Sequence, residues 1–381
     1  SKINLDLRNN CLSALSIYVA DSLVLQNEIP VIIKPYKDSD EAVLVSKKYW
    51  GAFELLIVEA QKGIYKKKTA YFIGAIKEEH GSAYICDNNK YLTVKGNTCI
   101  KGDIYVPGAF LKREFFTGTI SPSDTIRHSN KSLPLINKNV ILFANKIRDL
   151  KQNRLAQFLI YPGSEIPFNS SVSFLDSTHV YYSSDNIIIA NVTLDGNIII
   201  RSDKSITINN SAKLNNIILS APIINVQNEF KGCVQLLSDS SLIIQRGSNL
   251  LYPSFVGVYS SYPSNITIYE KAVVSGGITL YTEFDKSKEE SVINIFQGAT
   301  INGVVYSNNA VKLGGNIYGS LICMRVISFA NNTNENDMLY NCIINPTVLK
   351  KDFFYPCLFS NSSRSVIFEE TKNEITSRNI D

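Results

Sequence analysis

Three tyrosines have the spacing expected of a ligand-binding surface. Tyr259, Tyr281 and Tyr306 each end an apolar segment, in the runs FVGVY, ITLY and GVVY. If these runs are equivalent strands of a repeated coil, their rings stack along one face of the molecule. Such a ladder is either a flat platform for sugar rings or a self-stacked structural column, worth about 0.5–1.5 kcal/mol per ring pair. The structural column is the favoured interpretation, and the glycan platform is the candidate binding site.

The residue sets of common active sites are missing from the sequence. His80, His128 and His179 are scattered in polar, turn-like settings, as is typical of surface histidines. No nucleophile-elbow, zinc-protease, P-loop or dinucleotide-binding motif occurs. Glycoside hydrolysis needs two carboxylates within about 5–10 Å of each other. The acidic residues of the repeated region fall mainly in turns, at mismatched positions: Asp195, Asp203, Asp239, Glu270, Glu283 and Asp285. We predict no catalytic residue, no metal site and no cofactor, and favour a protein that is not an enzyme.

Charge and cysteine content argue against nucleic-acid binding and against a zinc or redox site. The net charge is +4, and the basic residues are dispersed apart from Lys66–Lys68, which reads as a solvated turn. Nucleic-acid binding is therefore not predicted. The chain has seven cysteines and no C-x-x-C pair, so a zinc or thioredoxin-type site is not predicted either. In an oxidising compartment Cys86 could bridge Cys99, or Cys342 could bridge Cys357.

Short apolar segments recur at near-constant spacing from about residue 185 to 325. One series is NIII, NIIL, VQLL, FVGV, ITLY, GVVY and SLIC, and a second, interleaved series is SITI, PIIN, SLII, NITI, VINI and AVKL. Two interleaved series predict a coil repeated about six times, which adds one strand per coil to two or three parallel sheets. The predicted alignment places Ile199, Ile218, Leu236 and Gly257 in register.

The fold class is therefore mainly β: a parallel β-helix, or solenoid, preceded by an N-terminal α+β region. Residues 1–22 are predicted to hold an amphipathic helix, because Leu5, Leu12 and Leu15 recur near helical spacing. Residues 23–170 form the α+β region, in which the glycine-punctuated stretch 83–110 resembles a first, irregular solenoid turn. The solenoid itself spans 171–345, and residues 346–381 form a cap and tail, because an open solenoid end invites aggregation.

Several segments together resemble an uncharacterised family of cell-envelope proteins from the Bacteroidota. They are RNNCLSALSIYVADS, KKYWGAFELLIVEAQKGIYKKKTAYFIG, LTVKGNTCIKGDIYVPGAFLKR and GATINGVVYSNNAVKLGGNIYGSLIC, followed by YNCIINPTVLKKDFFYPCLF. In that family a single hydrophobic helix similar to a prepilin's precedes the ectodomain. The resemblance implies an anchored, outward-facing protein but no activity and no functional residues. A weaker likeness, through GATINGVVYSNNAVKLGGNIYG, is to bactofilin-like polymer-forming solenoids.

These observations predict a non-enzymatic ectodomain of the cell envelope with a structural, adhesive or pilus-associated role. Its expected partners are other envelope or pilus-like proteins or glycans. Membrane attachment would run through a segment upstream of this chain, continuous with the N-terminal helix. The alternative is a carbohydrate-active β-helix that binds or cleaves a polysaccharide. That alternative requires a cluster of acidic or basic side chains across adjacent coils.

Overall fold

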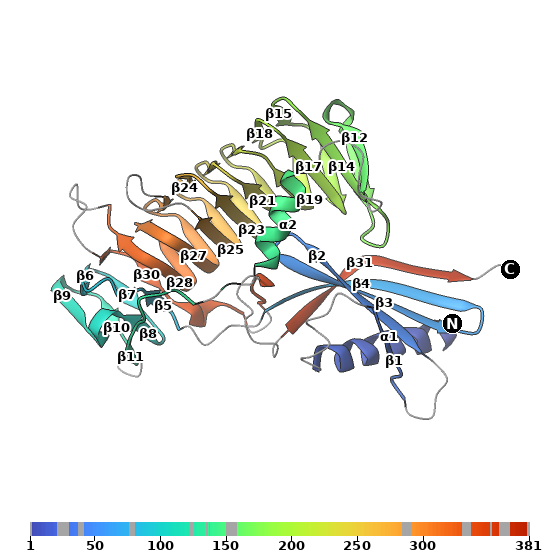
Figure 1. Ribbon diagram of the computed structural model, residues 1–381, viewed down its shortest axis with the longest axis horizontal. Coiled ribbons are helices and arrows are strands. Elements are labelled where there is room, and N and C mark those ends of the chain that lie inside the picture. The colour runs from blue at the N-terminus through green and yellow to red at the C-terminus, as the bar shows by residue number, and fades with distance from the viewer. Residues whose placement is uncertain are drawn as a thin grey trace.

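The computed structural model describes residues 2–20, 30–36, 42–75, 81–121, 125–134, 136, 138–149, 158–283, 291–329, 337–350, 353–357 and 366–378. It has two parts (Figure 1). One is a long parallel β-solenoid, which confirms the predicted fold class. The other, called the base below, is an antiparallel sheet with a helix on one face. The base packs against the side of the solenoid with its opposite face.

The solenoid has three faces, and the one that contacts the base is called the docking face. Its strands, in spatial order, are β12 (Phe158–Pro162), β14 (Thr178–Ser183), β17 (Ile198–Ser202), β19 (Lys213–Ser220), β21 (Lys231–Ser238), β23 (Asn249–Ser260), β25 (Val273–Thr282), β27 (Thr300–Leu313), β28 (Asn316–Ile327), β5 (Ala83–Ile85), β8 (Ile104–Val106) and β11 (Ile126–His128). From β19 to β28 the strands bend at a corner, so that each also contributes its first residues to the second face.

The second and third faces complete each coil. The second face begins with β13 (Asn169–Val172) and β16 (Thr193–Gly196) and ends with β30 (Ile343–Ile344), β7 (Cys99–Ile100) and β10 (Thr119–Ile120). The third face comprises β15 (Ile187–Ile189), β18 (Ser205–Ile208), β20 (Ile223–Val226), β22 (Ser241–Ile244), β24 (Asn265–Ile268) and β26 (Val292–Ile295), then the ends of β27 and β28. On that side follow β29 (Met338–Tyr340), β6 (Leu92–Gly96) and β9 (Leu111–Phe116). Short 3-10 turns occur at Pro107–Ala109, Gly163–Glu165 and Pro346–Val348.

Columns of branched apolar side chains hold the coils together. One column on the third face runs through seven consecutive strands in register and is buried throughout: Ile189, Ile208, Val226, Ile244, Ile268, Ile295 and Leu313. Each buried side chain of this size stabilises the fold by about 1.5–3 kcal/mol relative to exposure. In these four-residue strands buried side chains alternate with half-buried or exposed ones, as expected of a strand with one face in the core.

The solenoid has about 11 turns, so the predicted count of about six is wrong. Coils were missed at both ends of the stack, for different reasons. At one end, tyrosines, serines and a proline interrupt the apolar residues of β12, β13 and β14, so the apolar repeat is not evident in the sequence there. At the other end, the coils come from residues 83–128, which precede the rest of the solenoid in the chain but stack after β28. The stretch 83–110 is a solenoid segment, as predicted, but its predicted place as the first turn is wrong.

Backbone hydrogen bonds run across the point where the two chain segments meet. The amide of Leu321 on β28 donates to Ser82 O (2.9 Å), and the amide of Cys86 donates to Cys323 O (3.1 Å). On the second face, β30 pairs in parallel with β7, and the amide of Cys99 donates to Cys342 O (2.9 Å). Residues far apart in sequence thus continue one uninterrupted parallel ladder.

The predicted register of the coils holds at the first step and then fails. Ile199 opposes Ile218, as expected, but Ile218 opposes Gln235 rather than Leu236. The cause is a bulge in β19: Asn216, at φ +57°, is an extra residue between two paired positions. A one-residue slip of this kind exchanges the inner and outer faces of a strand. The positions of apolar residues in the sequence are therefore not sufficient to align the coils.

The base contains α1 (Lys2–Ala20) and the strands β1 (Val31–Ile33), β2 (Val43–Trp50), β3 (Phe53–Lys62), β4 (Tyr65–Ala75) and β31 (Val366–Arg378), paired in that order. A buried stripe of α1, including Leu7, Cys11, Leu15 and Tyr18, packs on one face of the sheet. A second helix, α2 (Asn139–Arg148), lies against the docking face of the solenoid. Within the described residues, neither helix is both long and apolar enough to cross a membrane.

The out-of-order stacking can be tested with an engineered disulfide. Ile85 on β5 and Cys323 on β28 are direct partners in the ladder, and both are buried inside the solenoid. Neighbouring strands lie about 4.8 Å apart, within the range that a disulfide spans. Under mild oxidation we therefore expect Ile85→Cys to form a bond to Cys323, detected by mass spectrometry of non-reduced peptides.

The matched control for this bond lies one coil further along the stack. Ile104 is equally buried, but its partners are Ala83 and Ile126, so Ile104→Cys faces no cysteine. It should give no new crosslink. A folded Ile85→Cys protein without the 85–323 link would contradict the stacking of β5 on β28.

Candidate functional site

The predicted tyrosine ladder is only partly in register. Tyr259 on β23 and Tyr281 on β25 are direct partners, as the sequence suggested. Tyr306 on β27 instead opposes Thr279, two residues before Tyr281. The three rings therefore do not form a single straight column.

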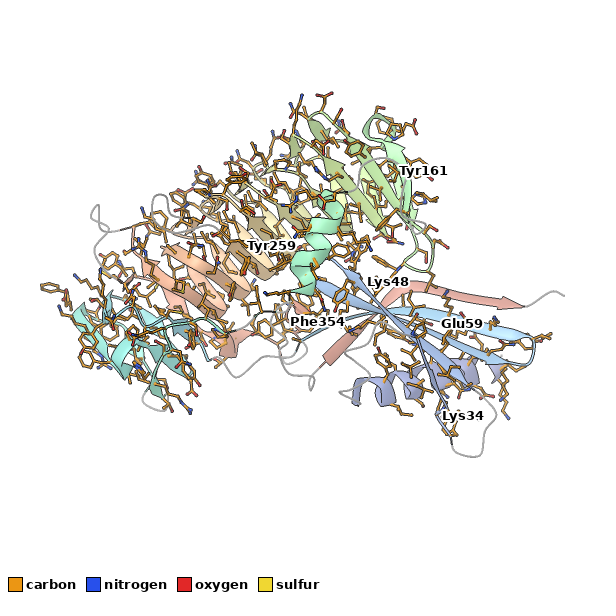
Figure 2. All side chains as sticks on the ribbon, viewed as in Figure 1. Lys34, Lys48, Glu59, Tyr161, Tyr259 and Phe354 are labelled. Atoms are coloured by element: carbon orange, nitrogen blue, oxygen red, sulfur yellow. The ribbon has the colours of Figure 1, made fainter. Side chains whose placement is uncertain are left out.

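The tyrosines lie on the docking face, beneath other parts of the protein. Tyr259 and Tyr306 are each 3% exposed, and Tyr281 is partly buried. Figure 2 shows Tyr259 beside α2, whose residue Ala144 lines the same small cavity. Burial raises the pKa of the hydroxyls of Tyr259 and Tyr306 far above the ordinary value of tyrosine. A sugar could reach the faces of these two rings only if the covering elements moved away.

The turn between β2 and β3 attaches the base to the solenoid. Gln235 of β21 accepts a hydrogen bond from the amide of Ala52 (2.8 Å) and donates one to Trp50 O (3.0 Å). Gly51, between them, has φ +64°, and a Cβ there would lie 2.0 Å from Gln235 Oε1. Glycine is therefore required both for the backbone conformation and for the close approach. Phe53, at the end of this turn, packs edge-on against Phe354 (5.7 Å).

A buried arginine attaches α2 to the same face. Arg201 of β17 is 4% exposed and donates to Arg148 O at the carboxyl end of α2 (3.1 Å) and to Asp203 Oδ1 (2.8 Å). Arg148 itself pairs with Asp239 (3.5 Å). A cation at the carbonyl end of a helix is favourable because it offsets the partial negative charge there. The arrangement fixes α2 and leaves no open acid pair of the kind that hydrolysis needs.

Another aromatic column lies on the third-face side and was missed by the sequence reasoning. The rings of Tyr269 and Phe296 stack at 5.1 Å and 17°, and Phe296 meets Phe329 at 4.7 Å. Lys312 Nζ lies 4.7 Å from the centre of the Phe329 ring. Tyr269 and Phe296 each directly follow a third-face strand, NITI or VINI. That equivalent position was the available signal, and the prediction instead compared residues at strand ends of the docking face.

The remaining candidates for chemistry have ordinary partners. His128 contacts Asp87 (3.4 Å) on the surface, His179 packs near the ring of Tyr161, and His80 lies outside the described residues. All seven cysteines are free thiols. In the part of the chain that the structure describes, no three His, Cys, Asp or Glu side chains form a group able to hold a metal ion.

Comparisons with known proteins add little to this geometry. No family model matches the chain, and no curated protein matches it. Among solved structures, the competence-associated pilin ComZ from Thermus thermophilus aligns over 99% of this chain and 98% of that chain, with 9% identity. The TM-score of 0.29 is too low for the alignment to support an argument about fold or function. The function must be inferred from this chain itself.

The buried hydroxyl of Tyr259 leads to a stability prediction. It finds no hydrogen-bond partner among the described residues, and such a group costs about 1–3 kcal/mol. We expect Tyr259→Phe to raise the free energy of unfolding by about 1 kcal/mol in denaturant titrations. The control Tyr281→Phe, at a partly exposed ring, should change it by less than about 0.5 kcal/mol. A clear loss of stability in Tyr259→Phe would contradict this account of the site.

The same variant has a pH signature. The pKa of Tyr259 is raised in the folded state, so the folded protein retains this proton at a pH where the unfolded chain, with a pKa of about 10, releases it. Titration of this group therefore leaves the free energy of unfolding unchanged below a pH of about 10 and lowers it as the pH rises further. Tyr259→Phe should therefore lose less stability above pH 10 than the unmodified protein.

The Gln235 contacts predict how strongly the base is attached. Gln235→Ala leaves the buried Ala52 amide and Trp50 carbonyl without their partner, at about 1–3 kcal/mol for each group. We expect a drop of about 2–4 kcal/mol in unfolding free energy. Gln227→Ala, at an exposed position on a coil corner, is the matched control and should be near neutral. Equal effects of the two substitutions would mean that Gln235 does not anchor the base.

Proposed function

We propose that this protein is a non-enzymatic ectodomain of the cell envelope, held at the far end of the base, with the solenoid projecting outward as a rigid arm. One observation carries the proposal: the contact with the solenoid and the first turn of α1 lie at opposite ends of the base sheet. One end of its sheet docks on the solenoid, and the other end carries the first turn of α1. An upstream membrane helix continuous with α1 would thus lead away from the solenoid.

Contacts at the far end of the base fix the direction of α1. Lys62, at the end of β3, pairs with Asp6 of α1 (3.3 Å), and Lys67 of β4 donates to Asn4 (3.2 Å). The last paired residue of β31, Arg378, opposes Tyr65 at the start of β4. The first turn of α1, the β3–β4 turn and the end of β31 therefore lie together, on the side away from the solenoid (Figure 1).

The form of the solenoid supports a structural or adhesive role. Stacked coils create an extended, regular surface whose stability comes from neighbour-to-neighbour contacts, which suits a spacer or a display surface. Only 19% of the residues are charged, and the chain is rich in Asn, Ser, Thr and Tyr, as is common on β-rich envelope proteins. Pilus-like proteins, other envelope proteins or glycans are the proposed partners. The alternative, a carbohydrate-active β-helix, would need a charged cluster on an open face.

Cell fractionation tests the proposal. The full-length gene product, expressed in its own cells, should sediment with membranes and be digested by protease added to intact cells. Detergent, but not high salt, should release it, because an apolar segment of about 20 residues holds it in the bilayer. A full-length product that stays in the cytosol and resists external protease would overturn the anchored-ectodomain proposal.

A parallel assay addresses the carbohydrate-active alternative. The purified chain would be incubated with a panel of polysaccharides, and reducing ends and unsaturated products would be measured. We expect no release above that of a heat-denatured control. Reproducible product formation would favour the alternative, whatever the cellular location.

A further inference from the structure

A cavity of about 520 Å³ lies where the base, α2 and the start of the solenoid meet. Its size is within the range of small-molecule sites, about 300–1,000 Å³. Apolar and aromatic side chains make up much of its wall, and charged side chains line the rest. The apolar group is Trp50, Leu142, Phe143, Phe158 and Leu175, and the charged group is Lys47, Lys48, Lys146 and Asp176.

Lys48, on the β2 wall, is a half-buried ammonium group without a carboxylate partner among the described residues. Its Nζ donates to Phe174 O (3.0 Å), a neutral acceptor. Burial lowers the pKa of Lys48, and the nearby charge of Lys68 lowers it further. A cation removed from water without a counter-ion is unfavourable, so an anion at this place would stabilise it. Its neighbour Lys47 differs, because it is paired with Glu54 (3.3 Å).

The facing wall supplies a second cation. Lys146 projects from α2, is exposed, and lines the same cavity. Asp176, the one carboxylate among the described residues of the lining, is exposed. With Lys47 neutralised by Glu54, the lining keeps two lysines against one aspartate, so it carries net positive charge. Asn139, which donates to Tyr49 Oη (2.6 Å), and Ser177 add polar groups.

We propose that this cavity binds a small organic carboxylate, with Lys48 and Lys146 as its charge partners and the aromatic wall against its apolar body. The pairing supplies the counter-ion that Lys48 lacks. Lys48 lies at the solenoid-facing end of the base sheet, near α2 (Figure 2). The carboxylate has two chemically equivalent sources, an acidic sugar or the C-terminus of a peptide. Both present the same charged group attached to a body of similar size.

Calorimetric titration with paired probes tests the proposal and separates the two sources. The probes are glucuronate with neutral glucose, and an acetylated dipeptide acid with its uncharged amide. We expect saturable binding of at least one carboxylate and none of its neutral counterpart. Loss of one charge-assisted contact weakens binding by about 10- to 100-fold, so Lys48→Gln and Lys146→Gln should each show this effect.

Two controls make the result decisive. Lys213→Gln removes an exposed lysine on the second face, outside the cavity lining, and should leave binding unchanged. Lys146 is exposed, so Lys146→Gln keeps the fold even if Lys48→Gln perturbs it. As a second readout, the bound probe should slow acylation of Lys48, measured by mass spectrometry, because a carboxylate partner favours the charged and unreactive ammonium. Lys213 acylation should not change.

Each result of these titrations either supports or overturns the proposed site. Carboxylate-selective binding that both cavity variants weaken supports the site, and the better probe identifies the source. Equal binding of acid and neutral probes, unchanged affinity in both variants, or no saturable binding of any carboxylate probe would overturn it. None of these results depends on where the full-length protein resides in the cell, so the proposed function stands or fails separately.

Discussion

The parallel ladder of a solenoid cannot end on an unpaired strand without leaving a row of backbone donors and acceptors open to another chain. At β28 this constraint is met from an unexpected source: residues 83–128 supply β5, β7 and β8, which extend the ladder in register. The rest of the architecture follows from this one pairing. Since β4 of the base ends only a few residues before β5, the base is held beside the stack and is not stacked on one of its ends.

Because the base lies beside the stack, it covers part of the docking face. A sheet placed beside the solenoid must cover some of it, and the covered surface needs apolar side chains and satisfied polar groups. The tyrosines of the docking face provide apolar area, and Gln235 satisfies two backbone groups of the β2–β3 turn. Aromatic residues that the sequence presented as a possible sugar platform are thus mostly the packing surface between two parts of one chain.

The cations on the two sides of α2, Arg201 and Lys48, differ in their partners. At the carboxyl end of this helix, Arg201 is buried, and its Nε and Nη2 groups donate to Arg148 O and Asp203. Along the cavity wall, Lys48 is half-buried, and its hydrogen-bond partner among the described residues is the neutral carbonyl of Phe174. Burial penalises both cations, but only Arg201 has a carboxylate to compensate. This contrast distinguishes a structural contact from a place where a ligand would gain affinity.

The sequence alone determined the local and repeated features: the recurring apolar segments of the third face, the existence of the N-terminal helix, and the parallel solenoid class. These depend on residues close together in the chain, whose spacing is visible by reading. The buried face of α1 was predicted only in part, because Leu15 is buried but Leu5 is exposed. The number of coils, the slip at Asn216 and the burial of Tyr259 and Tyr306 were decided only by the tertiary structure. Each depends on which distant segment lies alongside, as β5 lies beside β28, and neither periodicity nor composition encodes that choice. The cavity lysines illustrate the same limit, because Lys48 and Lys146 come from separate elements and face one cavity only after the base has docked.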